Sequence, residues 1–200
     1  MYKPGIVRAR SLLCYGAVVF ALFILLLPAV GEAGPPVGDK FGRWTFTCKA
    51  YGPGETKCAL VQEVRLKKGG RSGKRLLLAT MGYIGSSNVL ALAVRTPLNA
   101  YLPTGVVISV DSGRQRTIPF RQCKTDGCAS VVKITRQFRD ELTKGKKLHV
   151  RFKLILKKGL LKVPASVSLH GISRGFSALD GVTPPPGGKN KQDKDWSQIF

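Results

Sequence analysis

The residues most suggestive of chemistry lie near the carboxyl end, where residues 171–175 read Gly-Ile-Ser-Arg-Gly. This is the G-x-S-x-G pattern of the nucleophile elbow in serine hydrolases, and His170 directly precedes it. Such an elbow joins a strand to a helix in an α/β sheet, and the catalytic acid and histidine follow the serine along the chain. Here both histidines, His149 and His170, precede Ser173. We therefore do not expect an enzyme.

A short C-terminal helix is the preferred interpretation of the same segment. Ser173 would cap this helix, and Ile172 would pack before the cap as a hydrophobic staple. Ile172, Phe176 and Leu179 recur at the spacing of one apolar helix face. A secreted serine hydrolase that uses Ser173 stays as the disfavoured alternative.

Neither a nucleotide nor a metal ion is expected as a cofactor. The stretch GGRSGKR at residues 69–75 resembles a phosphate-binding loop, but Lys74 comes one position early when counted from Gly69. Arg75 stands where a Ser or Thr would bind magnesium. Neither cysteine pair has C-x-x-C spacing, and the chain has two histidines, which argues against a zinc site.

Positive charge is the functional signal that remains, with 33 Lys and Arg against 11 Asp and Glu. Two dense runs predict an anion-binding surface. The first holds Arg65, Lys67, Lys68, Arg71, Lys74 and Arg75, and the second holds Lys147, Arg151, Lys153, Lys157 and Lys158, flanked by Lys144, Lys146 and Lys162. In the second run, basic residues alternate with apolar ones, so a strand there would carry a basic outer face.

A domain with this charge should bind polyanions with an affinity that falls as salt rises. The expected partners are an anionic envelope component, either a lipid headgroup or lipopolysaccharide, or a sulfated glycan. Nucleic acid could bind physically but is not expected where export delivers the chain. Another hypothesis is a structural envelope protein without a ligand, whose charge serves only solubility.

The first 33 residues predict export. Lys3, Arg8 and Arg10 precede an apolar run from Leu12 to Val30, and small residues follow the run, as in a secretory signal peptide. An uncleaved N-terminal membrane anchor is the alternative, because about twenty apolar residues can span a bilayer. In both cases the rest of the chain would leave the cytosol, because the basic flank stays inside.

Four cysteines follow the apolar run. In an oxidising compartment they are expected to form disulfides, and four cysteines allow three pairings. We prefer the sequence-local pairing, Cys48–Cys58 and Cys123–Cys128, in which each bond closes a short loop and stabilises the fold by roughly 2–3 kcal/mol. Free buried thiols are the alternative.

Strands must position these residues. Alternating residues and turn signals predict about eight short strands, arranged as a β-sandwich or a small barrel. The expected strands cover residues 43–48, 57–66, 75–84, 89–94, 106–110, 115–120, 148–156 and 160–169. One inserted helix would begin after Thr135, carry Ile134, Phe138 and Leu142 on one face, and end at a left-handed Gly145.

The predicted organisation is a signal peptide or anchor at 1–33, a linker at 34–40, a β domain at 41–181 and a tail at 182–200. The tail is rich in Pro, Gly and charged residues, a composition typical of disorder. Without residues 1–33, thirty basic and ten acidic residues remain, a formal charge of +20.

Several motifs, taken in order, resemble one protein family. They are FGRWTFTC at 41–48, CALVQ at 58–62, LPTGVVISVD at 102–111, PFRQC with the following cysteine at 119–128, KGKKL at 144–148, and VPASVSLHGISRGFSAL at 163–179. Their order, together with both cysteine pairs, is similar to the invasion-associated locus B family of exported Gram-negative proteins. The resemblance extends from Phe41 to about Gly181.

This resemblance implies an immunoglobulin-like β-sandwich with two local disulfides, a periplasmic, outer-membrane-associated or secreted location, and a role in host-cell invasion and virulence. It also adds a polyanion or protein on a host surface to the expected partners. It supplies no catalytic residues. The sequence departs from the family at Arg43, where Asp is usual, and at Ile172, where Phe is usual. Because Arg43 adds to the basic surface, the partner is not inherited. We expect a non-enzymatic, disulfide-stapled binding protein of the bacterial cell envelope.

Overall fold

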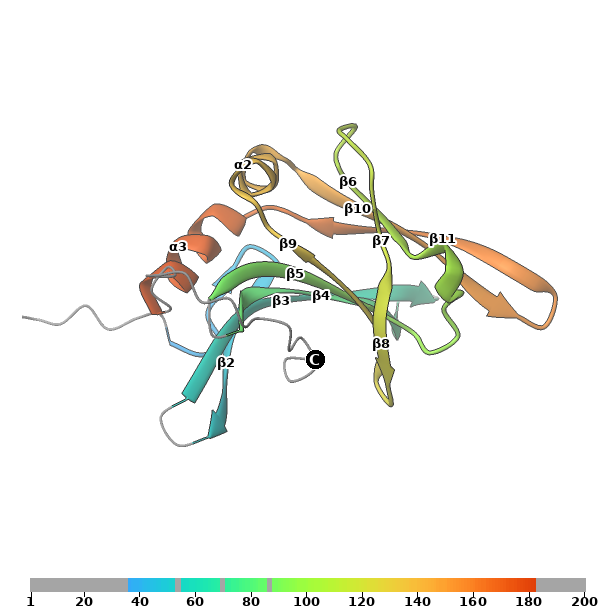
Figure 1. Cartoon of the computed structure of the whole chain (residues 1–200), viewed down its shortest axis with the longest axis horizontal. Coiled ribbons are helices and arrows are strands. Elements are labelled where there is room, and N and C mark those ends of the chain that lie inside the picture. The colour runs from blue at the N-terminus through green and yellow to red at the C-terminus, as the bar shows by residue number, and fades with distance from the viewer. Residues whose placement is uncertain (1–35, 53–54, 69–70, 86–87, 183–200) are drawn as a thin grey trace, which may run out of the picture. The chain divides into compact units, whose positions relative to one another are not determined.

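A computed structural model describes residues 36–52, 55–68, 71–85 and 88–182 of the chain (Figure 1). The signal peptide or anchor expected at 1–33 lies outside these residues, as does the tail beyond Val182. Within the described ranges, no helix is both long enough and apolar enough to cross a membrane.

Two antiparallel sheets make up most of the domain. In spatial order, the large sheet contains β1 (Lys40–Phe41), β2 (Trp44–Gly52), β3 (Glu55–Lys68), β4 (Arg71–Ile84), β5 (Val89–Thr96), β9 (Gly127–Lys133) and β8 (Phe120–Lys124). The small sheet contains β11 (Gly159–Ser168), β10 (Lys147–Leu156), β6 (Val106–Val110) and β7 (Arg116–Ile118). The prediction of a β-rich fold with strands in two layers is confirmed.

The core lies between the two sheets because alternate residues of their strands face one another. Trp44 and Phe46 of β2 are fully buried, as are Leu148 and Val150 of β10. Helix α3 (Ile172–Val182) adds Ile172, Phe176 and Leu179 to the same core, as its apolar spacing predicts. A short 3-10 turn, η1 (Leu102–Thr104), precedes β6.

Helix α2 (Arg136–Lys144) begins where the sequence indicates. The Thr135 hydroxyl accepts a hydrogen bond from the Phe138 N–H at 3.2 Å, and Phe138 and Leu142 are buried. The prediction for Gly145 is wrong in its conformation, because its φ is −78° and not left-handed. A glycine fits here since a Cβ would collide with the Val110 side chain.

The strand count exceeds the predicted number for three reasons. The two-residue strand β1 (Lys40–Phe41) lies at the boundary between the expected linker and the expected domain, before the first predicted strand. The run expected at 115–120 is divided at Pro119, where the chain leaves β7 of the small sheet and enters β8 of the large one. Strand β9 was not predicted, because its first five residues are all buried and no polar alternation marks them. It lies between β5 and β8.

Both disulfides have the predicted local pairing. Cys48 and Cys58 face each other across β2 and β3, and Cys123 and Cys128 face each other across β8 and β9. Each bond joins neighbouring strands of the large sheet, with Cα atoms 3.9 Å apart.

Candidate anion-binding surface

The outer face of the small sheet is basic. Along β10, Leu148, Val150 and Phe152 enter the core, whereas the intervening residues point away from it. These outward residues include Arg151, which is exposed, and Lys153, which is half-buried. Strand β10 therefore presents basic side chains on its outer side and packs apolar side chains into the core on its inner side.

Strand β11 adds to this face. Lys162 lies directly opposite Lys153, so two like charges share one side of the sheet, an arrangement that costs free energy unless an anion neutralises it. Neither β10 nor β11 contains an acidic residue. In the part of the chain that the structure describes, Arg151, Lys153 and Lys162 make no ion pair.

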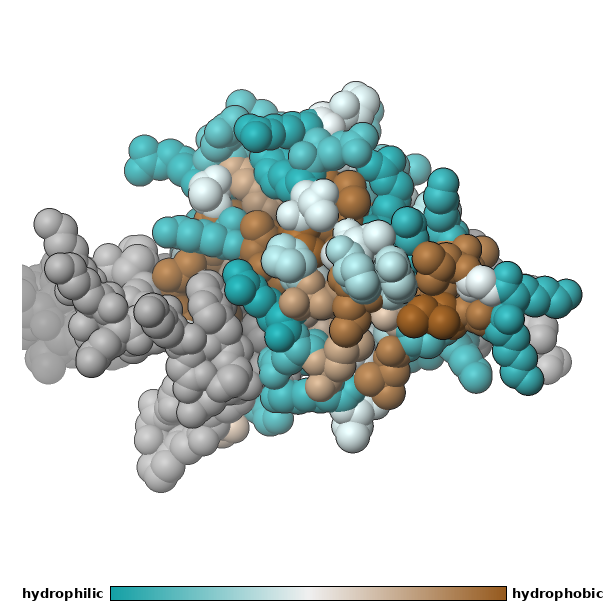
Figure 2. All heavy atoms as spheres, turned by 45° about the vertical axis from the view of Figure 1, so that its right-hand side comes forward, coloured by the Kyte–Doolittle hydropathy of each residue, from teal (hydrophilic) through white to brown (hydrophobic). Residues whose placement is uncertain are grey.

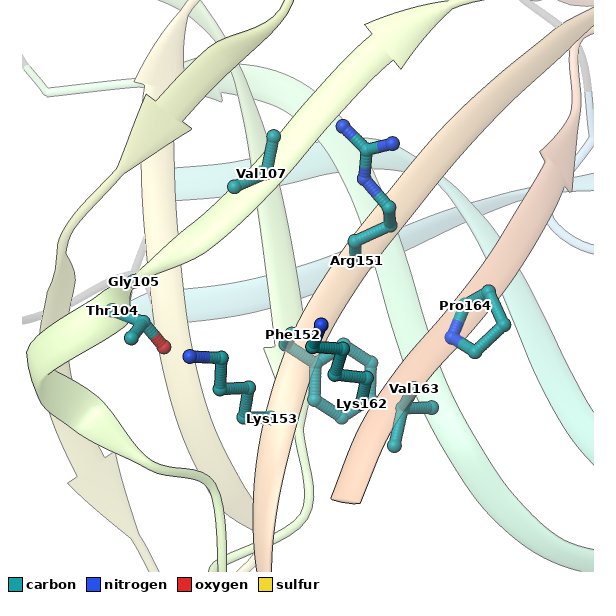
Figure 3. Close-up of a pocket in the computed structure, with 9 residues that line it drawn as sticks. All are labelled: Thr104, Gly105, Val107, Arg151, Phe152, Lys153, Lys162, Val163 and Pro164. Carbon is teal, nitrogen blue, oxygen red and sulfur yellow. The ribbon is translucent and has the colours of Figure 1, made fainter. Parts of the chain in front are cut away.

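A hollow of about 300 Å³ lies on the same face (Figure 3). Val107 of β6 and Pro164 of β11 stand on either side of Arg151, their register partner in β10. The residues that line the hollow are Thr104, Gly105, Val107, Arg151, Phe152, Lys153, Lys162, Val163 and Pro164. The hollow combines an apolar floor with three cationic side chains, which suits an anion attached to an apolar group.

Asp111 fixes the start of β10. Its carboxylate accepts hydrogen bonds from the backbone N–H groups of Lys146 and Lys147, at 3.0 and 2.9 Å. These two bonds lower the pKa of Asp111 from its ordinary value, because they stabilise the charged form. The carboxylate thus holds the backbone at the point where the basic strand begins.

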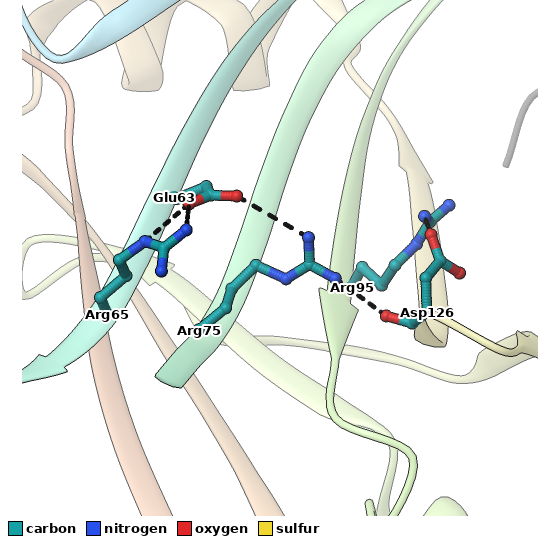
Figure 4. Close-up of polar contacts among 5 residues, drawn as sticks. All are labelled: Glu63, Arg65, Arg75, Arg95 and Asp126. Carbon is teal, nitrogen blue, oxygen red and sulfur yellow. Dashed lines mark hydrogen bonds and ion pairs between the residues drawn. The ribbon is translucent and has the colours of Figure 1, made fainter. Parts of the chain in front are cut away.

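The first predicted basic run is arranged differently. It forms the ends of β3 and β4, and two of its arginines are paired (Figure 4). Arg65 lies 2.6 Å from the Glu63 carboxylate, and Arg75 lies 3.7 Å from the same group. Arg75 also donates to the Asp126 carbonyl at 3.0 Å, and the Asp126 carboxylate pairs with Arg95.

Among the other residues of this run, Lys74 is exposed. The side chains of Lys67, Lys68 and Arg71 lie outside the described residues. Part of the charge expected from this run is therefore already neutralised by Glu63, and the segment is mostly strand.

Residues from both basic runs line one hollow. A second hollow, of about 360 Å³, is lined by Arg43 and Arg65 from one side and by Lys146 and Lys147 from the other, with Glu63 among them. The proximity of these residues could not be predicted from the sequence, because it depends on how the two sheets pack.

The G-x-S-x-G segment has a structural explanation. Gly171 has a φ of +84°, and a Cβ there would collide with the backbone of Phe41. A Cβ at Gly175 would lie 2.7 Å from the side chain of Leu60 in β3. Both glycines thus permit close packing of this segment against the large sheet.

The predicted cap is wrong by two positions. Helix α3 begins at Ile172, and the Gly171 carbonyl accepts from the Gly175 N–H at 3.1 Å, which makes Gly171 the capping residue. Ser173 lies exposed in the first turn, and Ile172 is the buried first residue of the helix rather than a staple before its cap.

No metal site is apparent within the described ranges, where no three His, Cys, Asp or Glu residues gather in a suitable group.

Comparison with known proteins identifies the family. The family model described as invasion associated locus B (IalB) protein matches residues 44–180. The chain belongs to the IalB family. No curated protein matches it significantly. Together, the two disulfides and membership of the IalB family indicate an extracytoplasmic protein.

A solved structure supports the fold of this IalB protein. The chain is similar to invasion associated protein b from Bartonella henselae, with a TM-score of 0.61 and 16% sequence identity. The match covers 72% of this chain and 95% of the other. At this identity the likeness concerns the fold.

Proposed function

We propose that this IalB protein is a non-enzymatic binding protein of the bacterial cell envelope that attaches to anionic surfaces through β10 and β11. Its location would be periplasmic, outer-membrane-associated or secreted. The binding would support interaction with host cells, in keeping with the words "invasion associated" in the names of its family and of the Bartonella henselae protein. An immunoglobulin-like strand topology stays a prediction.

One observation carries the proposal. The outer face of β10 and β11 gathers Arg151, Lys153 and Lys162 around an apolar hollow, and the two strands contain no acidic residue. By contrast, Arg65 and Arg75 share the carboxylate of Glu63. The small sheet therefore offers an incoming anion a cluster of positive charge that no described carboxylate neutralises.

The test is retention on immobilised heparin and on anionic vesicles as salt is raised. The variant Arg151→Glu/Lys153→Glu/Lys162→Glu should lose retention at low salt. A control with the same change in net charge, Arg121→Glu/Lys133→Glu/Arg136→Glu, alters exposed residues outside β10 and β11 and should lose much less. Absence of retention of the unmodified protein at low salt would overturn the proposal.

The enzyme alternative has its own test. A fluorophosphonate probe labels activated serines, so the unmodified protein and Ser173→Ala can be compared directly. We expect no labelling of either, because packing accounts for both glycines beside Ser173. Labelling that disappears in Ser173→Ala would favour the hydrolase instead.

A further inference from the structure

The end of the β10–β11 hairpin is unusually apolar for an exposed segment. Ile155, Leu156, Leu160 and Leu161 are each between 45% and 53% exposed. Figure 2 shows a hydrophobic patch beside hydrophilic groups at this side of the molecule. Contiguous exposed apolar side chains of this kind mark sites that bind a partner or a membrane.

A neighbouring segment extends the patch. The Ile155 N–H donates to the Asn99 carbonyl at 2.7 Å, and the Asn99 side chain donates back to the Ile155 carbonyl at 3.1 Å. These bonds hold residues 98–102 against the hairpin, and Leu98 and Leu102 are exposed there. Six of the nine large apolar side chains found exposed in the described residues thus belong to this region.

The hairpin is apolar on both of its faces. Ile155 pairs with Leu160 on the outer side, the side of Lys153 and Lys162. Leu156 continues the core-facing side, as does Leu161. Leu154 is still buried, whereas Leu156 and Leu161 are exposed, because the hairpin projects beyond the core (Figure 1).

Positive charge surrounds this apolar end. Lys157 and Lys158 form the exposed turn, and Lys153 and Lys162 flank Ile155 and Leu160 on the outer face. Long lysine stems can lie along an apolar surface while their ammonium groups reach a polar layer. The four aliphatic side chains thus lie between Lys153 and Lys162 on one side and the turn lysines on the other, and this mixture matches the boundary between anionic headgroups and acyl chains in a bilayer.

We propose that the end of the β10–β11 hairpin inserts into an anionic phospholipid bilayer, with Ile155, Leu156, Leu160 and Leu161 entering the acyl region and the lysines contacting headgroup phosphates. This rests on the proposed function and specifies the surface that is bound. A sulfated glycan can pair with the lysines but has no apolar region in which the four aliphatic side chains could be buried. A bilayer provides both anionic groups and an apolar interior.

Salt separates the two contributions to binding. Electrostatic attraction is strongly screened at about 1 M salt, whereas burial of aliphatic side chains is not. The full chain should therefore stay bound to vesicles of phosphatidylcholine and phosphatidylglycerol at high salt while it is released from heparin. Ile155→Ser/Leu160→Ser should lower vesicle affinity at high salt by about tenfold or more and leave retention on heparin unchanged.

The matched control removes two exposed aliphatic side chains elsewhere. Val37 precedes β1, and Val182 ends α3, which lies at the other end of the domain from the hairpin (Figure 1). Val37→Ser/Val182→Ser should bind vesicles as the unmodified protein does. Equal losses in the two double variants would overturn the proposal, because general hydrophobicity would then explain the binding.

Depth of insertion gives a second readout that does not depend on affinity. The unmodified chain has two tryptophans of its own, so the signal of Ile155→Trp is the emission in excess of that of the unmodified protein. This excess emission should shift to the blue on anionic vesicles and be quenched by brominated acyl chains. In Val37→Trp the introduced indole should show neither change. An Ile155→Trp signal that brominated lipid does not quench would overturn insertion.

The outcomes distinguish this proposal from the one on which it rests. Only the insertion proposal fails if the protein binds both heparin and vesicles at low salt, is released from both at high salt, and Ile155→Ser/Leu160→Ser behaves like the unmodified protein. If neither binds at low salt, both proposals fail.

Discussion

The side-chain amide of Gln62 pairs with the backbone of Ser168 as a neighbouring strand would. Its Nε2 donates to the Ser168 carbonyl at 2.9 Å, and its Oε1 accepts from the Ser168 N–H at 2.9 Å. The indole of Trp44 donates to the same carbonyl at 2.8 Å. Since Ser168 ends β11, these three hydrogen bonds join the large sheet to the small one.

Removal of this connection should destabilise the fold. Gln62 is only 5% exposed, so Gln62→Leu leaves the Ser168 N–H without its partner and should cost about 1–3 kcal/mol. Urea unfolding measures the loss. Gln115 is exposed, and Gln115→Leu should change stability by no more than about 0.5 kcal/mol. Equal effects of the two substitutions would contradict the role given to Gln62.

Alanine substitutions of the glycines at the two ends of α3 should change the stability of the fold in opposite directions. Gly171→Ala forces a Cβ into the backbone of Phe41 at a positive φ and should cost about 1–3 kcal/mol or more. Gly181 lies in α3 with open space around it, so Gly181→Ala should stabilise by about 0.4–1 kcal/mol. Thermal unfolding of both variants checks the signs, and a stable Gly171→Ala protein would refute the packing argument.

Alkaline pH should weaken a contact between β4 and α3. The Tyr83 hydroxyl donates to the Asp180 carboxylate at 2.6 Å, and Arg139 pairs with that carboxylate at 2.5 Å. Burial, and then the hydrogen bond to Asp180, raise the pKa of Tyr83 above its ordinary value of 10.0. A raised pKa in the folded state means that the contribution of Tyr83 is complete below pH about 10 and is lost as pH rises through the folded value.

The measurement is the free energy of unfolding of the unmodified protein and of Tyr83→Phe between pH about 8 and about 12. The difference between them should shrink at the alkaline end, since the phenol loses the proton that it donates. Tyr101→Phe, another partly buried tyrosine, is the control. A difference that stays constant with pH would contradict the assignment.

The disulfides should contribute unequally. Cys48–Cys58 spans ten residues and Cys123–Cys128 spans five. The chain-entropy model gives about 2.7 kcal/mol for the longer loop and about 2 kcal/mol for the shorter one. Double serine variants of each pair, unfolded in urea, should keep this order. The reverse order would show that entropy of the unfolded chain does not set the difference.

Local features of the fold could be predicted from the sequence. The Thr135 cap and the alternation in β10 both depend on residues close together in the chain, and both appear in the structure. The buried strand β9 gave no alternating signal. The Ser173 cap was mistaken because the choice of Gly171 depends on contact with Phe41, which is distant in the sequence.

The candidate surface also has features that could be predicted from the sequence and features that could not. The basic face of β10 follows from alternation, so it could be predicted from residues 147–156 alone. The pairing of Arg75 with Glu63 depends on the register between β3 and β4, which no local pattern specifies. The exposed apolar end of the β10–β11 hairpin could not be predicted from the sequence. Alternation indicates only that Ile155 and Leu160 belong to strands, and only the packing shows that the hairpin projects beyond the core.

Both disulfides lie within the large sheet, and the small sheet has no cysteine. Extracytoplasmic reductants and oxidants can therefore loosen or tighten the large sheet without any covalent change in the strands that carry the proposed binding face. The affinity for an anionic surface would then not depend on redox conditions as long as the domain stays folded. Exposure to thiols would instead shorten the lifetime of the folded protein.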